Sequence, residues 1–337
     1  MTPNPSPWTP PGQSFERVHG GPDEHGAPAH DFSTNSNACG PCPSALAAVA
    51  RADASTYPDA SYTQLRQQLA DFHAVAVQRV VLAASASEFI FRITVMAVQR
   101  GVQAVSLPPH SYGDYAQAAR AHRLPVLADS AGTCLHWSCE PSSPLGGAHD
   151  GLSALVDGFG AGSMVVLDRA YEPMRLSGTP SLGTTQLQKV WQLWTPNKAL
   201  GLTGVRAAYA IAPLGADADI NVMNQLCPSW PIGAHGVAML QAWTQADTQA
   251  WLASALETLR DWKVQQVALC TSFGWTVLLS HANFFVCRWG QDASALVQLR
   301  AHGIKLRDCT SFGLPGHVRL SVQSPAAQNA LRAGLQI

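Results

Sequence analysis

The sequence predicts an α/β protein, with a large domain built on a mainly parallel sheet and a smaller α+β domain after it. The chain has 337 residues, 47% of them hydrophobic, which is enough for about two domains with their own cores. From about residue 60 to 195, short apolar runs alternate with longer amphipathic stretches, the pattern of strands joined by helices. After the Pro-rich stretch 227–233 this alternation stops.

The elements of the first part are expected in chain order. Residues 1–30 are rich in Pro, Gly and His and predict an extended arm. Because ligands of such sheets bind at the carboxyl ends of the strands, polar residues at those ends are the first candidates for a site. Apolar runs predict buried strands at 80–83, 104–107, 126–128, 164–167 and 190–193. Helical periodicity predicts helices over 61–73, 87–99, 113–122 and 148–157.

The last third of the chain has a different order of elements. It predicts a helix over about 235–262, short strands at 267–270, 284–287 and 318–322, and a last helix over 325–334. This mixture is typical of an α+β domain. We therefore expect an N-terminal arm that joins the small domain (1–45), a large domain (46–225) and a small C-terminal domain (226–337).

Composition and charge exclude several functional classes. Charged residues make up 13% of the chain and the formal net charge is −1, so no field of that size would hold nucleic acid or an anionic membrane nonspecifically. The most apolar stretch, 80–98, is interrupted by Glu88 and Arg92 and predicts no membrane span. The N-terminal segment has prolines and no apolar core, so we expect no signal peptide, a cytoplasmic location and reduced cysteines.

Two cysteine and histidine patterns do not indicate a site. The string CGPC (39–42) matches a thioredoxin-type dithiol, but it follows NSNA where that motif needs a strand, and Pro43 comes next. The twelve histidines show no HExxH motif and no pairing with cysteine at zinc spacing, so no metal is expected. The ten tryptophans are expected in the core or in a dimer interface.

The segment WTPNKALGLTGVRAAY (194–209) carries the strongest chemical signal. An apolar strand ends in Thr195, and Lys198, a Gly-rich turn and Arg206 follow. A lysine at a strand end beside a ligand crevice can form a Schiff base with an aldehyde, and Thr195 and Arg206 could hold a phosphate on either side of it. The alternative is a solvated surface lysine and arginine, and the spacing alone leaves both interpretations open.

This motif resembles that of the fold-type-I pyridoxal-phosphate (PLP) enzymes, in the class I/II aminotransferase group. The resemblance implies that Lys198 is the Schiff-base lysine and that Thr195 and Arg206 hold the phosphate of pyridoxal 5'-phosphate. MVVLDRAY (164–171) resembles the family strand that ends in Asp. Asp168 would then pair with the pyridine nitrogen and keep it protonated, and Tyr171 would hydrogen-bond O3′ of the ring.

Two more segments resemble the same family in the same order. AASASEFIF (83–91) resembles the turn into a helix under the PLP phosphate, which implies the backbone N–H groups of Ala86 and Ser87 as anion donors. PHSYGDY (109–115) resembles the segment whose aromatic residue stacks on the pyridine, here Tyr112. Taken alone, a tyrosine such as Tyr112 is more often a packing residue.

The outer segments resemble a narrower part of the family, threonine-phosphate decarboxylase of cobalamin biosynthesis and its relative histidinol-phosphate aminotransferase. These segments are HGG (19–21), DFSTNSN (31–37), YPDASY (57–62) and IKLRDCTSFGLPGHVRLSV (304–322). The resemblance implies that His19 and Asn35 lie near the substrate and that Arg307 and Arg319 take its carboxylate or phosphate. It also implies that Tyr57 reaches the PLP phosphate of a neighbouring subunit, and hence a homodimer. Without the family, each arginine is equally a surface ion pair, Arg307 with the adjacent Asp308.

The chain departs from the family pattern in three places. SSPLG (142–146) replaces the usual Asn-Asn-Pro-Thr-Gly turn, so the partner of O3′ is Ser143, whose hydroxyl has a shorter reach. Arg169 stands where the family has an acidic residue after the strand Asp. The stretch between Tyr112 and Ser143 is short, so a helix beside the substrate is expected to be missing.

The resemblance implies a PLP-dependent aminotransferase acting on a small amino acid or amine, with or without a phosphate group. Lys198, once freed by the substrate amine, would move a proton to or from Cα. Two alternatives stay open: a threonine-phosphate decarboxylase-like lyase, which shares this machinery, and a degenerate PLP-binding protein without catalysis. Ser143 and Arg169 are the features that support the degenerate form.

Overall fold

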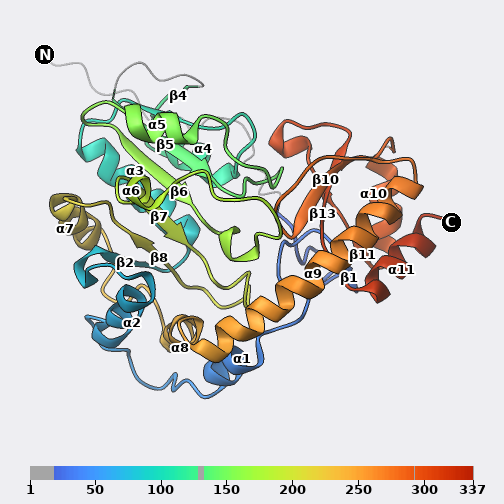
Figure 1. Cartoon of the computed structure of the whole chain (residues 1–337), viewed down its shortest axis with the longest axis horizontal. Coiled ribbons are helices and arrows are strands. Elements are labelled where there is room, and N and C mark those ends of the chain that lie inside the picture. Colours follow the sequence, from blue (N-terminus) through green and yellow to red (C-terminus); the bar gives the residue numbers. More distant parts are fainter. Residues whose placement is uncertain (1–18, 128–132, 292, 337) are drawn as a thin grey trace, which may run out of the picture.

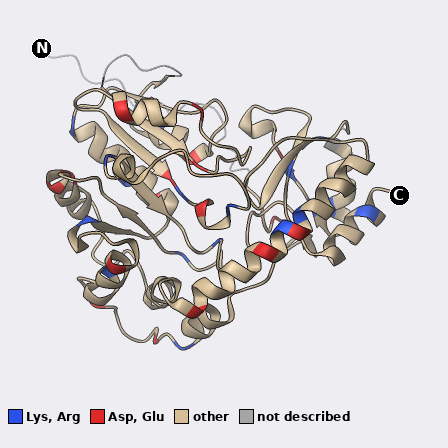
Figure 2. Cartoon of the chain, in the orientation of Figure 1, with Lys and Arg blue, Asp and Glu red and all other residues tan. Residues whose placement is uncertain are grey.

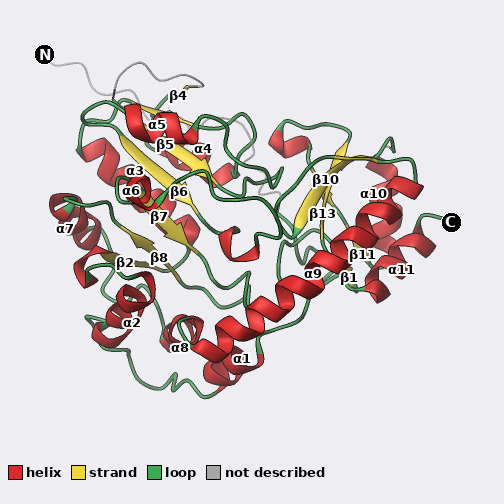
Figure 3. Cartoon of the chain, in the orientation of Figure 1, coloured by secondary structure: helices red, strands yellow, loops and turns green. Residues whose placement is uncertain are grey.

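The computed structural model describes residues 19–127, 133–291 and 293–336. Two β-sheets flanked by helices make up most of the molecule, and a two-stranded pair ties an N-terminal segment to the C-terminal part (Figures 1 and 3). The long helix α9 (Ala246–Ser272) runs diagonally across the molecule, from α1 and α8 at one end to the smaller sheet at the other (Figure 1).

Within the described residues, the larger sheet has seven strands and is parallel except at β8, which is antiparallel to both of its neighbours. The strand order is β2 (Val80–Ala83), β8 (Ala208–Ile211), β7 (Trp191–Trp194), β6 (Met164–Asp168), β5 (Cys134–Cys139), β3 (Ala104–Ser106), β4 (Val126–Leu127). The five strands predicted before residue 195 all lie in this sheet with bounds shifted by at most one residue, except that residue 128 is outside the described residues. β5 and β8 were not predicted.

Helices cover both faces of this sheet. One face carries α3 (Ala86–Gln99), α4 (Gly113–Ala121) and α7 (Asp217–Gln225). The other face carries α1 (Pro43–Ala50), α2 (Thr63–His73), α5 (Leu152–Gly158), α6 (Thr184–Leu187) and α8 (Ala234–Trp243). Successive strand residues point to opposite faces: Val81 packs with the first set of helices and Val80 with the second. This two-sided burial explains why the strands have apolar runs rather than alternating patterns.

The smaller sheet is antiparallel, and its strands come from the last quarter of the chain. Its order is β12 (Arg307–Asp308), β13 (His317–Ser321), β10 (Phe284–Arg288), β9 (Thr276–Val277). The end of α9, α10 (Ala293–Ala301) and α11 (Pro325–Gly334) contribute to its core. β1 (His30–Asp31) pairs in parallel with β11 (Ile304–Lys305), so the segment after residue 30 lies against this part of the molecule.

Two predictions for the region 235–270 are wrong. The helix expected over 235–262 is two helices, α8 and α9, because Gln245 is extended (ψ 145°) and the Thr244 hydroxyl bonds back to the Gln241 carbonyl. The strand expected at 267–270 is the last part of α9. The buried residues Gln266, Leu269 and Cys270 recur at helical spacing, and the chain turns only at Gly274, where φ is +77°.

Charged residues are sparse along the ribbon, and α9 carries both signs along its length (Figure 2). Among the helices of the described residues, none combines the length and the apolar character that crossing a membrane requires. Because charged residues of both signs are interspersed along the described ribbon, charge alone does not mark a functional site (Figure 2).

Candidate active site

A cavity of about 490 Å³ lies at the carboxyl ends of the central strands of the larger sheet. Asp168 is the last residue of β6, and Thr195 directly follows β7. Ala86, the first residue of α3, lines the same cavity, and so does His19 from the N-terminal part of the chain. The fold thus collects these side chains where parallel sheets bind their ligands.

Asp168 is a buried acid of this cavity, with 4% of its surface exposed. Its Oδ2 accepts a hydrogen bond from the Tyr115 hydroxyl at 2.6 Å, and its Oδ1 accepts one from the Ala170 amide at 2.9 Å. Burial raises the pKa of the Asp168 carboxyl, and the two hydrogen bonds act against that shift. A cationic group in the cavity would stabilise the ionised form.

Tyr115 is a site residue that the sequence interpretation missed. It lies on α4, one helical turn after Tyr112, and its ring stacks on Trp137 with centroids 4.3 Å apart. Because the ring is fully buried, the hydroxyl has a fixed direction, toward Asp168. The spacing of two tyrosines at i and i+3 was the available signal, since such residues share one face of a helix.

Lys198 lies in the turn after β7, and its Nζ is 5.5 Å from the centroid of the Tyr171 ring. The turn is held from the N-terminal side of the chain. The Asn37 amide donates to the Lys198 carbonyl at 2.9 Å, and the Asn37 side chain donates to the Ala199 carbonyl at 3.0 Å. Gly201 (φ +67°) is so close to Gly40 that a Cβ would lie 2.6 Å from its carbonyl oxygen. The CGPC segment thus packs against the lysine turn, and Cys39 and Cys42 are free thiols.

One end of the cavity has the features of an anion cradle. Helix α3 begins there, with Ala86 and Ser87 in its first turn, and the Ser85 hydroxyl satisfies only the Glu88 amide, at 3.1 Å. The hydroxyl of Thr195 is buried and has no hydrogen-bond partner among the described residues. Arg206 lines the same cavity. Free amides, an unpaired hydroxyl and a guanidinium fit a phosphate group.

Of the remaining predicted site residues, Tyr112 and Ser143 line this cavity, and Asn35 does not but contacts the lining residue Tyr171. The Asn35 amide donates to the Tyr171 hydroxyl at 3.3 Å, while Asn35 Oδ1 has no partner among the described residues. The Tyr112 hydroxyl lies 3.3 Å from Ser87 Oγ, and burial raises the pKa of Tyr112. The hydroxyl groups of Tyr112 and Ser143 are therefore placed where a ligand in the cavity could meet them.

A side cavity of about 230 Å³ adjoins the first one, and His19 and Tyr112 line both. Arg307 on β12 and Arg319 on β13 line it, with 5% and 6% of their surfaces exposed. They are partners in the strand register. Burial lowers the pKa of both guanidinium groups, and the charge of Arg319 lowers that of Arg307 further. Two neighbouring buried cations favour an anion between them.

The partners of the two arginines differ from the predicted surface ion pairs. Arg319 donates to the Ser33 carbonyl at 2.9 Å and to Ser143 Oγ at 3.4 Å, and its Nε has no hydrogen-bond partner among the described residues. Arg307 donates to Ser311 Oγ at 2.8 Å and to the main-chain oxygen of Asp308. The Asp308 carboxylate caps Thr310 instead, accepting from its amide at 2.9 Å.

Two predicted features lie away from the cavity. Tyr57 is 76% exposed and stacks on Trp230 with centroids 4.5 Å apart, so within one chain it does not reach the site. Arg169 is not among the lining residues: its guanidinium lies 4.4 Å from the centre of the Trp194 ring and 3.6 Å from Glu172 Oε1. Arg169 therefore leaves the cavity open. The sequence also predicts that a helix is missing between Tyr112 and Ser143. That stretch includes residues 128–132, which lie outside the described residues.

Comparisons with known proteins agree with this geometry. The model of the family "Aminotransferase class I and II" matches residues 128–333. The histidinol-phosphate aminotransferase of Halorubrum lacusprofundi is 28% identical over 315 residues, which cover 86% of this chain and 83% of that protein.

Solved structures share the fold. The histidinol-phosphate aminotransferase of Sinorhizobium meliloti, in complex with PLP, has a TM-score of 0.75 at 19% identity, covering 90% of this chain and 88% of its own. L-threonine-O-3-phosphate decarboxylase of Porphyromonas gingivalis has a TM-score of 0.76 at 20% identity, covering 90% and 98%. The predicted PLP-dependent transferase-like fold is confirmed. The chain therefore belongs to the aminotransferase class I and II family of PLP-dependent enzymes.

Proposed function

We propose that this aminotransferase binds PLP in the 490 Å³ cavity, covalently at Nζ of Lys198, and acts on a small amino acid or amine that carries an extra anionic group. The observation that carries the proposal is that one cavity is lined by an amine, a buried carboxylate and an anion cradle: Lys198, Asp168 and the start of α3 with Thr195 and Arg206. These three features suit the aldehyde, the pyridine nitrogen and the phosphate of one cofactor.

The residues around the cavity have separate tasks toward the cofactor. The amides of Ala86 and Ser87, the Thr195 hydroxyl and the Arg206 guanidinium would hold its phosphate. Asp168 would face the pyridine nitrogen, and Tyr112 would pack against the ring. Tyr171 and Ser143 would supply hydroxyl groups for O3′. When bound, the cofactor supplies an electron sink for the bonds at the substrate's Cα.

Lys198 has the second chemical task. Its Nζ is a primary amine that lines the cavity. When it is not bonded to the cofactor, Nζ would move a proton to or from the substrate's Cα, as general base and acid. The neighbouring Tyr171 ring, 5.5 Å away, restricts the directions open to this amine.

Substrate recognition falls to the side cavity. Arg319 is buried, and its hydrogen-bond partners among the described residues are neutral oxygens, so it would take a carboxylate or phosphate bidentately. Arg307 would add a second charge to the same anion or hold another one. His19 and Asn35 would contribute from the arm. A cavity of about 230 Å³ fits a short side chain with an anionic end.

A second candidate reaction is decarboxylation of a phosphorylated amino acid. The register pairing of Arg307 with Arg319 favours it, because two guanidinium groups side by side match a dianionic phosphate better than a single carboxylate. If they hold the phosphate, the substrate's carboxylate is left free to leave as carbon dioxide. If Arg319 holds the carboxylate, the proton on Cα is the group that leaves.

Borohydride reduction tests the common part of the proposal. Treatment of the purified protein should fix the cofactor on the chain, with the added mass on the peptide that contains Lys198. Assays with histidinol phosphate plus 2-oxoglutarate and with O-phospho-L-threonine then separate the reactions. Arg307→Lys should lose most with phosphorylated substrates. No added mass at Lys198 would overturn the proposal.

The working unit is proposed to be a homodimer. Tyr57 and Trp230 form an exposed aromatic pair, and Tyr57 would reach the phosphate end of the partner's cavity. Exposed aromatic residues of this size are common at protein interfaces. Sedimentation at micromolar concentration should give a dimer, and Tyr57→Ala should weaken cofactor binding. A fully active monomer would exclude this arrangement.

A further inference from the structure

We propose that Asp23 is a positioning residue that clamps residues 19–26 against the C-terminal part of the chain, so that His19 and Gly20 form a fixed wall of the substrate cavity. The inference rests on the proposed function, in which the side cavity binds the substrate. It assigns a task to an ion-pair cluster that lines neither cavity. Loss of the clamp should weaken substrate binding and spare cofactor binding.

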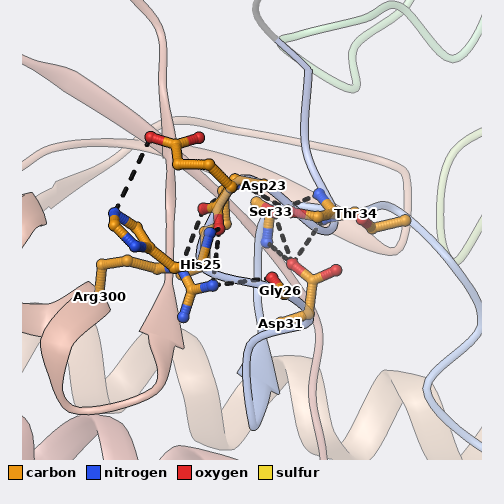
Figure 4. Close-up of polar contacts among 10 residues, drawn as sticks. Asp23, His25, Gly26, Asp31, Ser33, Thr34 and Arg300 are labelled. Atoms are coloured by element: carbon orange, nitrogen blue, oxygen red, sulfur yellow. Dashed lines mark hydrogen bonds and ion pairs between the residues drawn. The ribbon is translucent and has the colours of Figure 1, made fainter.

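The clamp is a carboxylate shared by two cations (Figure 4 shows Arg300). Arg300 on α10 donates from Nε to Asp23 Oδ2 at 2.9 Å and from Nη2 to Oδ1 at 2.7 Å. Lys305 on β11 places its Nζ 2.8 Å from Oδ2. The three side chains are only 16–18% exposed, and the two cations hold the pKa of Asp23 well below its usual range. Such bidentate, partly buried networks are more persistent than ordinary surface pairs.

The same two cations also hold the backbone of the arm. Arg300 Nη2 donates to the Gly26 carbonyl at 2.8 Å, and Lys305 Nζ donates to the Gly21 carbonyl at 2.7 Å. Between these points the chain closes on itself, with the Gly26 amide donating to the Asp23 carbonyl at 2.9 Å. Both ends of the segment 21–26 are therefore hydrogen-bonded to the C-terminal part of the chain, one to α10 and one to β11.

The arm also fits closely against residues 31–34. A Cβ on Gly20 would lie 2.2 Å from the Ser33 carbonyl oxygen, so no side chain can stand there. The Gly21 amide donates to Ser33 Oγ at 2.8 Å. Asp31 Oδ1 in turn accepts from the Ser33 amide at 2.8 Å and from the Thr34 amide at 3.2 Å (Figure 4).

Ser33 links the arm to Arg319, the arginine proposed to bind the substrate. Its carbonyl oxygen, against which Gly20 packs, also accepts the 2.9 Å hydrogen bond from Arg319. His19 and Gly20 line both cavities, while Asp23, Arg300 and Lys305 line neither. The arm and Arg319 are thus parts of one assembly, and because Asp23 lines neither cavity, it can affect the substrate only through the residues that it positions, first of all His19 and Gly20.

The test uses Asp23→Asn in the cofactor-loaded enzyme. The neutral amide keeps the size of the side chain but leaves Arg300 and Lys305 without their shared anion. We expect the KM for the amine substrate to rise about tenfold and kcat to change less than about twofold, with the cofactor spectrum unchanged. Asp23→Glu should restore part of the affinity. The matched control is Asp157→Asn, which breaks the Asp157–Lys189 pair (2.9 Å) outside both cavities and should change none of these values.

A double-mutant cycle separates positioning from general stabilisation. If Asp23 acts through the arm, the double variant should have a KM less than about twofold above that of His19→Ala alone. Both substitutions would remove the same contact, the one between the His19 side chain and the substrate. Full additivity would overturn the inference, as would an unchanged KM in Asp23→Asn. If Asp23→Asn lost both kcat and bound cofactor, Asp23 would only stabilise the fold, and the inference would be wrong.

Hydrogen exchange provides a readout that needs no substrate. The amides of Gly21 and Gly26 should exchange faster in Asp23→Asn than in the parent, while those of β6 should not change. Unchanged exchange over 19–26 would refute the clamp. A chain that takes up no PLP at all would refute the proposed function instead, so the two failures are distinguishable.

Discussion

The two adjoining cavities together have two walls of different construction. The sheet-edge wall consists of Asp168, Thr195, Lys198 and the start of α3, all placed at the ends of elements in one sheet layer. The arm wall consists of His19, Ser33, Arg307 and Arg319, which come from two distant parts of the chain, near its two ends. One wall carries the chemical groups, and the other carries the charges that a substrate would meet.

The difference shows which kind of constraint each task needs. On the sheet-edge wall, Asp168 is fixed by nearby elements of the large domain, through Tyr115 on α4 and the Ala170 amide, and only the Lys198 turn is held from outside, by Asn37. On the arm wall, contacts between segments more than 250 residues apart fix the groups, as between Ser33 and Arg319. Damage to the first wall should therefore stop the chemistry, whereas damage to the second should change affinity.

Lys198→Ala should have the largest effect. The variant keeps the anion cradle and so should still bind PLP weakly, but borohydride should fix no cofactor on the chain. Turnover should fall by about 10³-fold or more, because both the covalent attachment and the general base are lost. Steady-state assays and mass spectrometry of the reduced protein measure this. Retained turnover would mean that the amine of the sheet-edge wall lies elsewhere.

Asp168→Asn should have the next largest effect, on the order of 10²-fold in the chemical step, with PLP occupancy falling much less. The amide cannot balance a protonated pyridine nitrogen. Single-turnover rates measure the loss, and unchanged rates would reject the role.

The same substitution should not destabilise the cofactor-free chain at neutral pH. Because burial raises the pKa of Asp168, the folded state binds this proton more tightly than the unfolded state, and ionisation costs stability as the pH rises. The uncharged amide avoids that cost. The Tm of apo Asp168→Asn at pH 7 should equal or exceed that of the parent, and any advantage should shrink toward acid pH.

Arg319→Lys tests the arm wall and should act on affinity. A lysine cannot reproduce the two-point contact with a carboxylate, nor reach the Ser33 carbonyl and a ligand together. The KM for the amine substrate should rise by about 10- to 100-fold, while the cofactor spectrum stays the same. If the variant binds substrate as well as the parent does, the anion site lies outside the side cavity.

The two walls were not equally predictable from the sequence. The sheet-edge wall follows strands whose apolar runs are continuous, so its polar residues stand out at strand ends, as Asp168 and Thr195 do. The arm wall depends on contacts that no local pattern encodes: the register that places Arg307 beside Arg319, and the clamp formed by Asp23, Arg300 and Lys305. Only the family resemblance indicated Arg307 and Arg319.

Helix boundaries failed for a related reason. The residues of 267–270 are apolar enough for a strand, and only the burial of every third or fourth residue along α9 makes them helical. Tyr115 was missed because a buried tyrosine on a helix predicts packing, and the direction of its hydroxyl depends on the stack with Trp137. Both cases depend on tertiary contacts.

Tyr115→Phe should have the smallest effect, and it shows how finely the sheet-edge wall is set. The variant keeps the stacked ring and removes one hydrogen bond to the ionised carboxylate of Asp168, so the pKa of Asp168 should rise further. Chemistry at neutral pH should slow by about 3- to 10-fold, which corresponds to the net contribution of about 1 kcal/mol that is typical of one hydrogen bond. The acid limb of kcat/KM should move to higher pH, because Asp168 would be protonated earlier as the pH falls. A matched Tyr112→Phe variant keeps the cavity ring but leaves the Asp168 hydrogen bond intact, so its acid limb should stay in place. Equal shifts in both variants would mean that loss of any cavity hydroxyl causes the effect. Tyr115 would then have no specific role in setting the pKa of Asp168.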